Sequence, residues 1–417
     1  MKKLYLILCA GILALAAVSC GKDVPPAKPM TAPEVKQKLA DTAVDALKEV
    51  DPNLWKDWGQ SGLKLVNALR KVEEGNLDDL GDDLEAVMRS VVTKDKKTTV
   101  TLLLKLSQFK GDITVVDDAF QYTKSNNPLN LTYVFEGKTY KAQLESSGES
   151  GDGILLRESE HEVFGSEEES EVRIIKLVAP AKAAIHVTEN GKLFLDAVIN
   201  PVIEDKNKNG ILDDTDAIKG TATIQIPGYS LALNSLSISD EGVTAALDLS
   251  HDSKKVLSVE ADVEMDLFIE RVKAALDETT VNTKPDDITG TVSILGGAAL
   301  LKADIDMGDL QNAETHYATE AEARKVAAVF TKNAKADLYF DNNPTVQASL
   351  CFLVEQDDKE LWEIVPGLHL YDGSADVPIV EFFDLTEDVW KPVTGEFASF
   401  MSKISKYFGD LLPKKML

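Results

Sequence analysis

Oxygen-bearing side chains alternate along a short acidic stretch near the middle of the chain, between residues 205 and 216. A hard cation such as calcium binds six to eight oxygens, and alternate residues of a tight loop can direct their oxygens to one point. Gly210 allows the sharp turn that brings the two halves of the loop around the ion. The stretch therefore predicts a calcium site. The predicted ligands are Asp205, Asn207, Asn209, the backbone carbonyl of Ile211, Asp213 and Asp216.

This spacing resembles the EF-hand loop, with ligands at alternate positions, a central glycine and an acid at the last position. The EF-hand family has glutamate at that last position, and the shorter Asp216 is similar to the extracellular loops of dockerins. Residues on both sides are predicted as strands. We therefore expect a structural calcium loop within a β-hairpin, with a dissociation constant of roughly 10⁻⁴–10⁻³ M. A metal-free turn is the alternative, because Asp, Asn and Gly favour turns without any ion.

The amino terminus has the sequence of an export signal. Lysines at positions 2–3 are followed by the uncharged apolar stretch 4–17 and by small residues that lead to Cys20. The apolar stretch is shorter than the ~20 residues that a helix needs to cross a bilayer. Residues 17–20 resemble a lipobox, the signature of bacterial lipoproteins, although Ala stands where Leu is commonest. Cleavage would remove residues 1–19. An ordinary signal peptide, cut by the general signal peptidase, is the alternative.

The lipobox resemblance implies that Cys20 carries a diacylglyceryl thioether and an amide-linked acyl chain such as palmitate. Several acyl chains hold a protein stably on a membrane, because each buried methylene contributes ~0.8 kcal/mol. Residues 21–23, Gly-Lys-Asp, have no aspartate directly after the cysteine, which resembles lipoproteins sorted to the outer membrane. Both the periplasmic and the cell-surface side of that membrane are compatible with this sequence. Prolines predict a stiff stalk over residues 20–30.

The chain is strongly acidic, with a formal net charge of −26 at pH 7. This charge repels phosphates, which excludes nucleic-acid binding and favours cations and basic partners. Only 6% of the residues are aromatic, which argues against a large stacking platform for sugars or bases. Because 44% of the 417 residues are hydrophobic, the chain can build a large core and two or three domains.

Of the three cysteines, Cys9 lies in the export signal and Cys20 in the lipobox. The remaining Cys351 has no other cysteine with which to form an intrachain disulfide. It lies in the apolar run from Ala348 to Val354. We therefore expect a small buried hydrophobic side chain at this position, with a reactive nucleophile as the alternative.

Residues 31–93 are predicted as a helical segment. The sequence Thr31-Ala-Pro-Glu34 is a capping box, and apolar residues follow it at helical spacing up to Val50. A second helix is predicted over 54–72 and a third over 77–91, each with a one-sided apolar stripe. These stripes indicate a small bundle, or a helical layer that covers another element.

Residues 97–310 are predicted as a β-rich body that contains the calcium loop, because the apolar period changes to two. Tight hairpin turns are predicted around residues 136–138, Asn190-Gly191 and Gly296-Gly297. The short connections predict an antiparallel meander, with one helix over 267–276. The acidic stretch 146–171 is expected to be a solvated loop, with an acidic metal or partner patch as the alternative.

Residues 311–417 are predicted as an α/β part that packs on this body. It would contain a helix over 314–332, a hairpin around 341–344 and an amphipathic helix over 397–412. We expect that last helix to pack on the sheet, with a membrane-surface helix as the alternative. The predicted fold class is α+β, a large antiparallel β-meander sheet with an N-terminal helical segment and a C-terminal amphipathic helix.

No catalytic spacing stands out elsewhere. The five histidines form no short metal motif, and neither a nucleophile elbow nor a phosphate loop is present. The sequence favours a non-enzymatic, membrane-anchored lipoprotein of the cell envelope that binds another protein or an envelope component. Two alternatives stay open. One is a protein that binds a lipid or another hydrophobic ligand, and the other is a hydrolase whose active site is assembled from distant residues.

Overall fold

The computed structural model places the chain in two compact units. The described residues are 27–69, 89–95, 99–105, 110–116, 119–162, 170–208, 215–265, 287–308, 310, 314, 316–356 and 360–409. The predicted signal peptide, the acylation site Cys20 and the helix predicted over 267–276 lie outside them. Unit 1 holds the described residues up to Leu54 and those from Glu241 onward, and unit 2 holds those of Trp55–Asp240.

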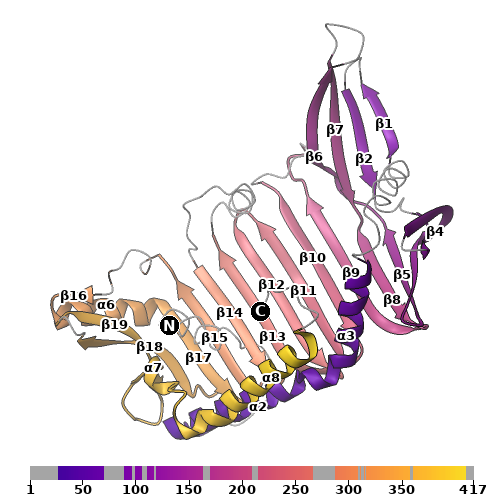
Figure 1. The fold of residues 1–417 in the computed structure, drawn as a ribbon. Coiled ribbons are helices and arrows are strands. Elements are labelled where there is room, and N and C mark those ends of the chain that lie inside the picture. The colour runs from indigo at the N-terminus through magenta and orange to yellow at the C-terminus, as the bar shows by residue number, and fades with distance from the viewer. Residues whose placement is uncertain are drawn as a thin grey trace. The chain divides into compact units, whose positions relative to one another are not determined.

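Unit 1 contains an antiparallel sheet in which strands that follow one another in the sequence mostly pair in space (Figure 1). Its strands in spatial order are β16 (His316–Tyr317), β19 (Trp362–Leu370), β18 (Ala348–Gln356), β17 (Ala334–Phe340), β15 (Ala299–Asp306), β14 (Asp287–Ile294), β13 (Lys254–Glu264) and β12 (Gly242–His251). A short β20 (Val377–Pro378) pairs with β19. This is the predicted meander, with further strands after residue 360.

Helices cover one face of the unit 1 sheet. They are α2 (Ala32–Glu49), α6 (Glu320–Asn333), α7 (Ile379–Phe382), the 3₁₀ turn η2 (Asp388–Trp390) and α8 (Lys391–Phe408). The predicted capping box begins α2, where the Thr31 N–H donates to Glu34 Oε2 at 2.7 Å. The helices α2 and α8 lie side by side (Figure 1), and Lys403 Nζ reaches Asp51 Oδ2 at 2.5 Å.

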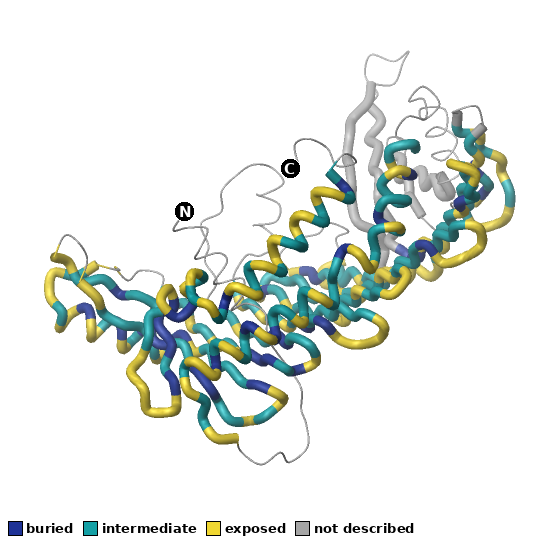
Figure 2. Tube along the Cα trace, turned by 60° about the horizontal axis from the view of Figure 1, so that its bottom comes forward, coloured by how far each residue is buried: buried dark blue, intermediate teal, exposed yellow. Residues whose placement is uncertain are grey.

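The helix α2 and residues from the last third of the chain form one core in unit 1. Lys36 Nζ of α2 lies 2.7 Å from Glu387 Oε1, and Lys38 Nζ lies 2.8 Å from Asp341 Oδ1. Val35 of α2 and Phe382 of α7 are fully buried, in one cluster with residues of β17, β18 and β19. Figure 2 shows buried residues gathered where these helices meet the strands. The helices therefore pack their apolar side chains against the apolar face of the unit 1 sheet.

Unit 2 contains α3 and two sheets. The helix α3 spans Pro52–Leu69, so that its first turn belongs to unit 1. The larger sheet is antiparallel, in the order β11 (Tyr229–Ser239), β10 (Ala217–Ile226), β9 (Lys192–Glu204), β8 (Lys182–Glu189), β5 (Lys138–Ser147), β4 (Ala119–Phe135) and β3 (Lys110–Val116). The smaller sheet has the order β1 (Arg89–Asp95), β2 (Thr99–Lys105), β7 (Ser170–Ala179) and β6 (Ser150–Glu162), with β2 and β7 parallel.

The coarse fold prediction is confirmed: antiparallel sheet dominates the described residues, with helices near both sequence ends. The hairpin turns stand where the turn residues predict them. Asn190 and Gly191 have φ angles of 49° and 78°, and Glu136 and Gly137 have 47° and 74°. These left-handed angles belong to two-residue turns whose twist matches that of the flanking strands. Local turn chemistry therefore sets the register of β4 with β5 and of β8 with β9.

Three local predictions are wrong. Most of the stretch 146–171 is not a solvated loop, because residues 150–162 form β6 and pair with β7. The helix predicted over 77–91 cannot extend past residue 88, since the β-branched sequence around Val91 starts β1. The helix predicted over 314–332 begins only at Glu320, after the Thr319 cap, because His316 and Tyr317 pair with β19. In each case pairing with a distant strand overrides the local pattern.

Candidate functional site

The predicted calcium loop connects β9 with β10. The Cα atoms of Glu204 and Ala217 are partners in this antiparallel pair, and Asp205 and Asp216 are the next residues inward. Partner Cα atoms in such a pair lie about 4.5–5.5 Å apart. The hairpin therefore holds the first and last predicted ligands close together, as an ion-binding loop requires. The flanking residues are strands, as predicted from the sequence.

Asp216 is buried at the closed end of this loop. Its side chain is 1% exposed, and its Oδ1 accepts a hydrogen bond from the Lys206 N–H at 3.0 Å. Nearby, Asn207 Nδ2 donates to Thr215 Oγ1 at 3.1 Å. A charged carboxylate is costly to bury unless cations or hydrogen-bond donors surround it. The burial of Asp216 therefore fits a ligand that completes a cation site.

Three of the six predicted ligands, Asn209, Ile211 and Asp213, lie outside the described residues. Among the residues that the structure describes, no group of three or more His, Cys, Asp or Glu side chains converges closely enough to hold a metal ion. The structure thus brings Asp205 and Asp216 together at the base of the loop, and the calcium assignment stays a prediction.

The larger sheet of unit 2 has one apolar face. Residues that are register partners on neighbouring strands lie on the same face of the sheet. One such row consists of Ile185, Ala197, Ile224 and Leu231. Below we call this side the apolar face of unit 2. Its members are Leu129, Leu131, Tyr133 and Phe135 of β4, Tyr140, Ala142 and Leu144 of β5, Ala183, Ile185 and Val187 of β8, Leu195, Ala197, Ile199 and Ile203 of β9, Ile218, Ala222, Ile224 and Ile226 of β10, and Tyr229, Leu231, Leu233, Leu236 and Ile238 of β11.

The opposite face is mainly polar. His186, Asp196 and Gln225 form one row across it, and Asn200 Nδ2 donates to Thr221 Oγ1 at 2.9 Å in another. Because successive side chains of a strand point to opposite faces, this contrast follows from strict alternation in each strand. A sheet with one apolar and one polar face needs a cover on its apolar face only.

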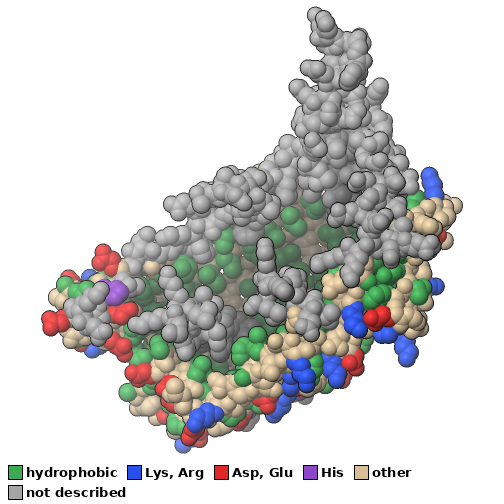
Figure 3. All heavy atoms as spheres, viewed as in Figure 1, with side chains coloured by type: hydrophobic (Ala, Val, Ile, Leu, Met, Phe, Trp, Pro, Cys, Tyr) green, Lys and Arg blue, Asp and Glu red, His purple; other side chains and the backbone are tan. Residues whose placement is uncertain are grey.

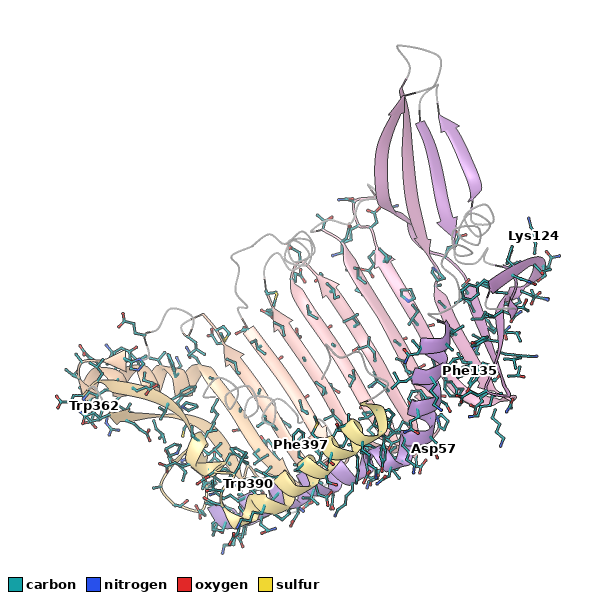
Figure 4. The ribbon with its side chains drawn as sticks, viewed as in Figure 1. Asp57, Lys124, Phe135, Trp362, Trp390 and Phe397 are labelled. Atoms are coloured by element: carbon teal, nitrogen blue, oxygen red, sulfur yellow. The ribbon has the colours of Figure 1, made fainter. Side chains whose placement is uncertain are left out.

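One end of the apolar face is covered by α3. Trp58 of α3 donates from Nε1 to the carbonyl of Phe194 at 2.6 Å, and the two rings lie 5.7 Å apart. Tyr140, Phe135 and other residues of this end pack around Phe194, and Figure 4 shows Phe135 at the end of β4 beside α3. This contact fixes the helix near the tight turns of the sheet.

A hydrogen-bonded charge network supports the same end. Glu189 accepts from Lys138 Nζ and from the Tyr140 hydroxyl, both at 2.7 Å, and Lys138 also reaches Ser61 of α3 at 3.2 Å. The hydrogen bond from Lys138 lowers the pKa of Glu189. Burial, together with the neighbouring Glu189 carboxylate, raises the pKa of Tyr140 to about 12. Tyr140 is therefore a neutral structural donor near neutral pH.

The other end of the apolar face is exposed. Ile185 is 44% exposed, Ile199 is 48%, Ile224 is 43% and Leu231 is 36%. These side chains occupy adjacent rows on four neighbouring strands, so that they form one patch. Figure 3 shows hydrophobic side chains gathered over strands on the face turned to the viewer. A contiguous aliphatic patch of this kind marks a binding surface more often than scattered apolar residues do.

Cys351 of β18 is buried, as predicted from its apolar sequence context. It is 6% exposed, and burial raises the pKa of its thiol to about 12. A thiol that stays protonated is a poor nucleophile, because the thiolate is the reactive form. Cys351 therefore belongs to the packing of unit 1.

No helix of the described residues is both long enough and apolar enough to cross a membrane. No family model, curated protein or solved structure matches the chain.

Proposed function

We propose that this chain is a membrane-anchored, non-enzymatic lipoprotein of the cell envelope that binds a hydrophobic ligand on the apolar face of unit 2. The exposed patch of Ile185, Ile199, Ile224 and Leu231 carries this proposal. The lipobox at Cys20 supports the anchor and an outer-membrane location. The lack of catalytic spacing in the sequence supports a binding role.

The patch fits an acyl chain better than a polar ligand. Its four side chains are branched aliphatics, and the rows between them hold alanines and further aliphatics without a hydrogen-bonding group. Such a surface gains about 25 cal/mol for each Å² of apolar area that a ligand removes from water. It offers no donor or acceptor that could orient a polar group. The ligand class is therefore an extended hydrocarbon chain.

Two positions of β9 allow a matched test. Ile199 lies on the apolar face and Val202 on the opposite face, with exposures of 48% and 46%. A fluorescent fatty acid, dansyl-undecanoic acid, would be titrated into the purified chain and into Ile199→Asp and Val202→Asp. Because burying one aliphatic side chain contributes about 1.5–3 kcal/mol, I199D should weaken binding by about tenfold or more, with V202D near wild type.

Two results would contradict the proposal. One is that the wild-type chain does not bind the fatty acid. The other is equal binding by both variants, which would place the ligand elsewhere. Mass spectrometry of the natively purified chain is an independent measurement, since a carrier should retain lipid. Capture of a protein on the same patch, lost in I199D, would instead favour the protein-binding role.

We also propose that residues 205–216 bind one structural calcium ion. The closed hairpin and the buried Asp216 support this assignment. At roughly 2 mM calcium and the expected affinity, binding would stabilise the folded chain by about 0.7–1.8 kcal/mol. For a chain of 417 residues, thermal melts with calcium and with a chelator should then differ by about 1–2 °C.

The control variants separate a loop site from general ionic effects. Asp205→Ala should abolish the calcium-dependent shift, whereas Asp262→Ala, at an exposed position of β13, should keep it. If the wild-type chain melts at the same temperature with calcium and with chelator, the loop is a metal-free turn. A shift that persists in D205A would place the ion elsewhere.

A further inference from the structure

Three neighbouring strands of unit 2 end in a row of carboxylates. Glu204 of β9, Ala217 of β10 and Ser239 of β11 are register partners in the larger sheet. Partner Cα atoms on adjacent antiparallel strands lie about 4.5–5.5 Å apart. The β9–β10 loop and the β11–β12 turn begin or end one residue beyond this row. The residues at these next positions are Asp205, Asp216 and Asp240.

Asp240, in the β11–β12 turn, has a carboxylate oxygen that the protein leaves unsatisfied. Its Oδ1 is shielded from solvent and accepts no hydrogen bond. A buried carboxylate oxygen is costly unless a donor or a cation lies beside it, and an unsatisfied one indicates a bound ion or water. Lys219, on the same end of β10, is already paired, with its Nζ 2.8 Å from Glu204 Oε1.

The neighbouring position on β10 carries a second buried carboxylate. Asp216 is only 1% exposed, and the Lys206 N–H donates to its Oδ1 at 3.0 Å. Like charges at adjacent positions of neighbouring strands repel each other. A divalent cation offsets both this repulsion and the cost of burying the two carboxylates. The negative charge at this end of the sheet therefore extends beyond the loop whose spacing predicts the calcium site.

We propose that Asp240 belongs to the calcium site of residues 205–216, as an acidic residue that the β11–β12 turn supplies from outside the loop. This inference rests on the proposed calcium site. The three aspartates do not converge on one point among the described residues, so Asp240 acts through its charge and is not a coordinating ligand. Calcium keeps water among its ligands in many protein sites, and such a water is the donor that Asp240 Oδ1 lacks. The affinity for calcium is thus set by three strand ends.

Calcium titration of Asp240→Asn tests this role, because asparagine keeps the size of the side chain and removes its charge. Isothermal titration calorimetry with calcium chloride would measure the dissociation constant of the purified full chain. The matched control is Asp252→Asn. Asp252 is the first residue of the two-residue turn between β12 and β13, as Asp240 is between β11 and β12, but its side chain is 79% exposed. D240N should weaken calcium binding by about tenfold, whereas D252N should keep the wild-type dissociation constant.

Thermal melts in chelator separate this role from a purely structural one. Without the ion, the wild-type chain buries a carboxylate oxygen that has no partner. D240N should therefore melt in chelator at the same temperature as wild type or above it. A lower melting temperature of D240N in chelator would mean that Asp240 stabilises the fold itself, and would overturn the inference. Asp240→Glu keeps the charge and should retain most of the affinity that D240N loses. Equal weakening in D240E and D240N would exclude the charge as the cause.

The outcomes also distinguish this inference from the calcium site on which it rests. If wild type and D240N bind calcium equally while D205A does not bind it, the loop site stands and the role of Asp240 is overturned. If the wild-type chain takes up no calcium, the site and this inference fail together. Equal weakening in D240N and D252N would show a general effect of net charge, and would also overturn the role of Asp240.

Discussion

The two units share one pattern of alternating side chains but use their apolar sheet faces differently. In unit 1, α2, α6 and α7 cover that face, and Val35, Leu370 and Phe382 are fully buried. In unit 2, α3 covers one end of that face, and Ile185, Ile199 and Ile224 on the same face are 44%, 48% and 43% exposed. Alternation makes one face of a sheet apolar, whereas the helices that pack on this face decide whether it is a core or a binding surface.

Phe382→Ala tests the covered face and should have the largest effect. The ring is 0% exposed and contacts the Phe383 ring at a centroid distance of 5.1 Å. Removing a buried phenyl group leaves a cavity and costs about 3–5 kcal/mol of unfolding free energy. Urea denaturation followed by circular dichroism would measure this loss. A loss below about 1 kcal/mol would mean that the helices of unit 1 do not form a true core.

Trp58→Ala tests the part of unit 2 that is covered. The substitution removes the ring contact with Phe194 and the hydrogen bond to its carbonyl, so we expect a loss of about 2 kcal/mol. Asp57→Ala, at an exposed position of the same helix, is the matched control and should change stability by less than about 0.5 kcal/mol. Equal effects of the two substitutions would show that α3 is not held by the sheet.

The hydrogen-bonded network of Glu189, Lys138 and Tyr140 makes the stability of unit 2 depend on pH. In the folded chain the pKa of Glu189 is lowered from its ordinary value of 4.5. Its contribution is therefore complete above about pH 4.5 and is lost as the pH falls through the lowered pKa. Glu189→Gln should cost roughly 1 kcal/mol at pH 7 and less at pH 3, because this pair is partly exposed. Parallel melts at both pH values measure the difference, and a cost that does not change with pH would exclude the ionic contribution.

Ile199→Ser should have the smallest effect on stability. At 48% exposure the side chain contributes little to the core, so that we expect a change within about 0.5 kcal/mol. Binding of the fluorescent fatty acid should nevertheless weaken, since the same side chain would lie under the ligand. A destabilisation above about 2 kcal/mol would show that the patch is a covered core, and the contrast between the units would then disappear.

Features with a local physical cause could be predicted from the sequence. The pair Asn190-Gly191 adopts left-handed angles at little cost, and Thr31 with Glu34 closes the first turn of α2. Strands predicted on both sides of the loop imply that Asp205 and Asp216 lie close together, and in the structure they adjoin the strand pair Glu204 and Ala217. Each of these features depends on residues within about a dozen positions of one another.

Features that depend on distant partners could not be predicted. The acidic residues of β6 suggest a loop, and only pairing with β7 makes them a strand. The alternation does not indicate β19, which contains Pro366 and Gly367. Alternation predicts an apolar side of the strand that contains Ile199, but it does not indicate that this side chain stays 48% exposed in the folded chain. The sequence does contain an indication of this face, because β5, β8, β9, β10 and β11 each contribute apolar residues at alternate positions.

The ion pairs of α2 have a consequence for the order in which the chain can fold. Lys36 and Lys38 emerge early in synthesis, but their partners Glu387 and Asp341 are made 351 and 303 residues later. Among the described residues unit 2 is continuous in sequence, and it can assemble before any strand of the unit 1 sheet has been made. Until β17, β18, β19 and α7 have been made, the apolar stripe of α2 lacks most of the buried residues with which it clusters. Unit 1 can therefore complete its fold only after almost the whole polypeptide has been synthesised.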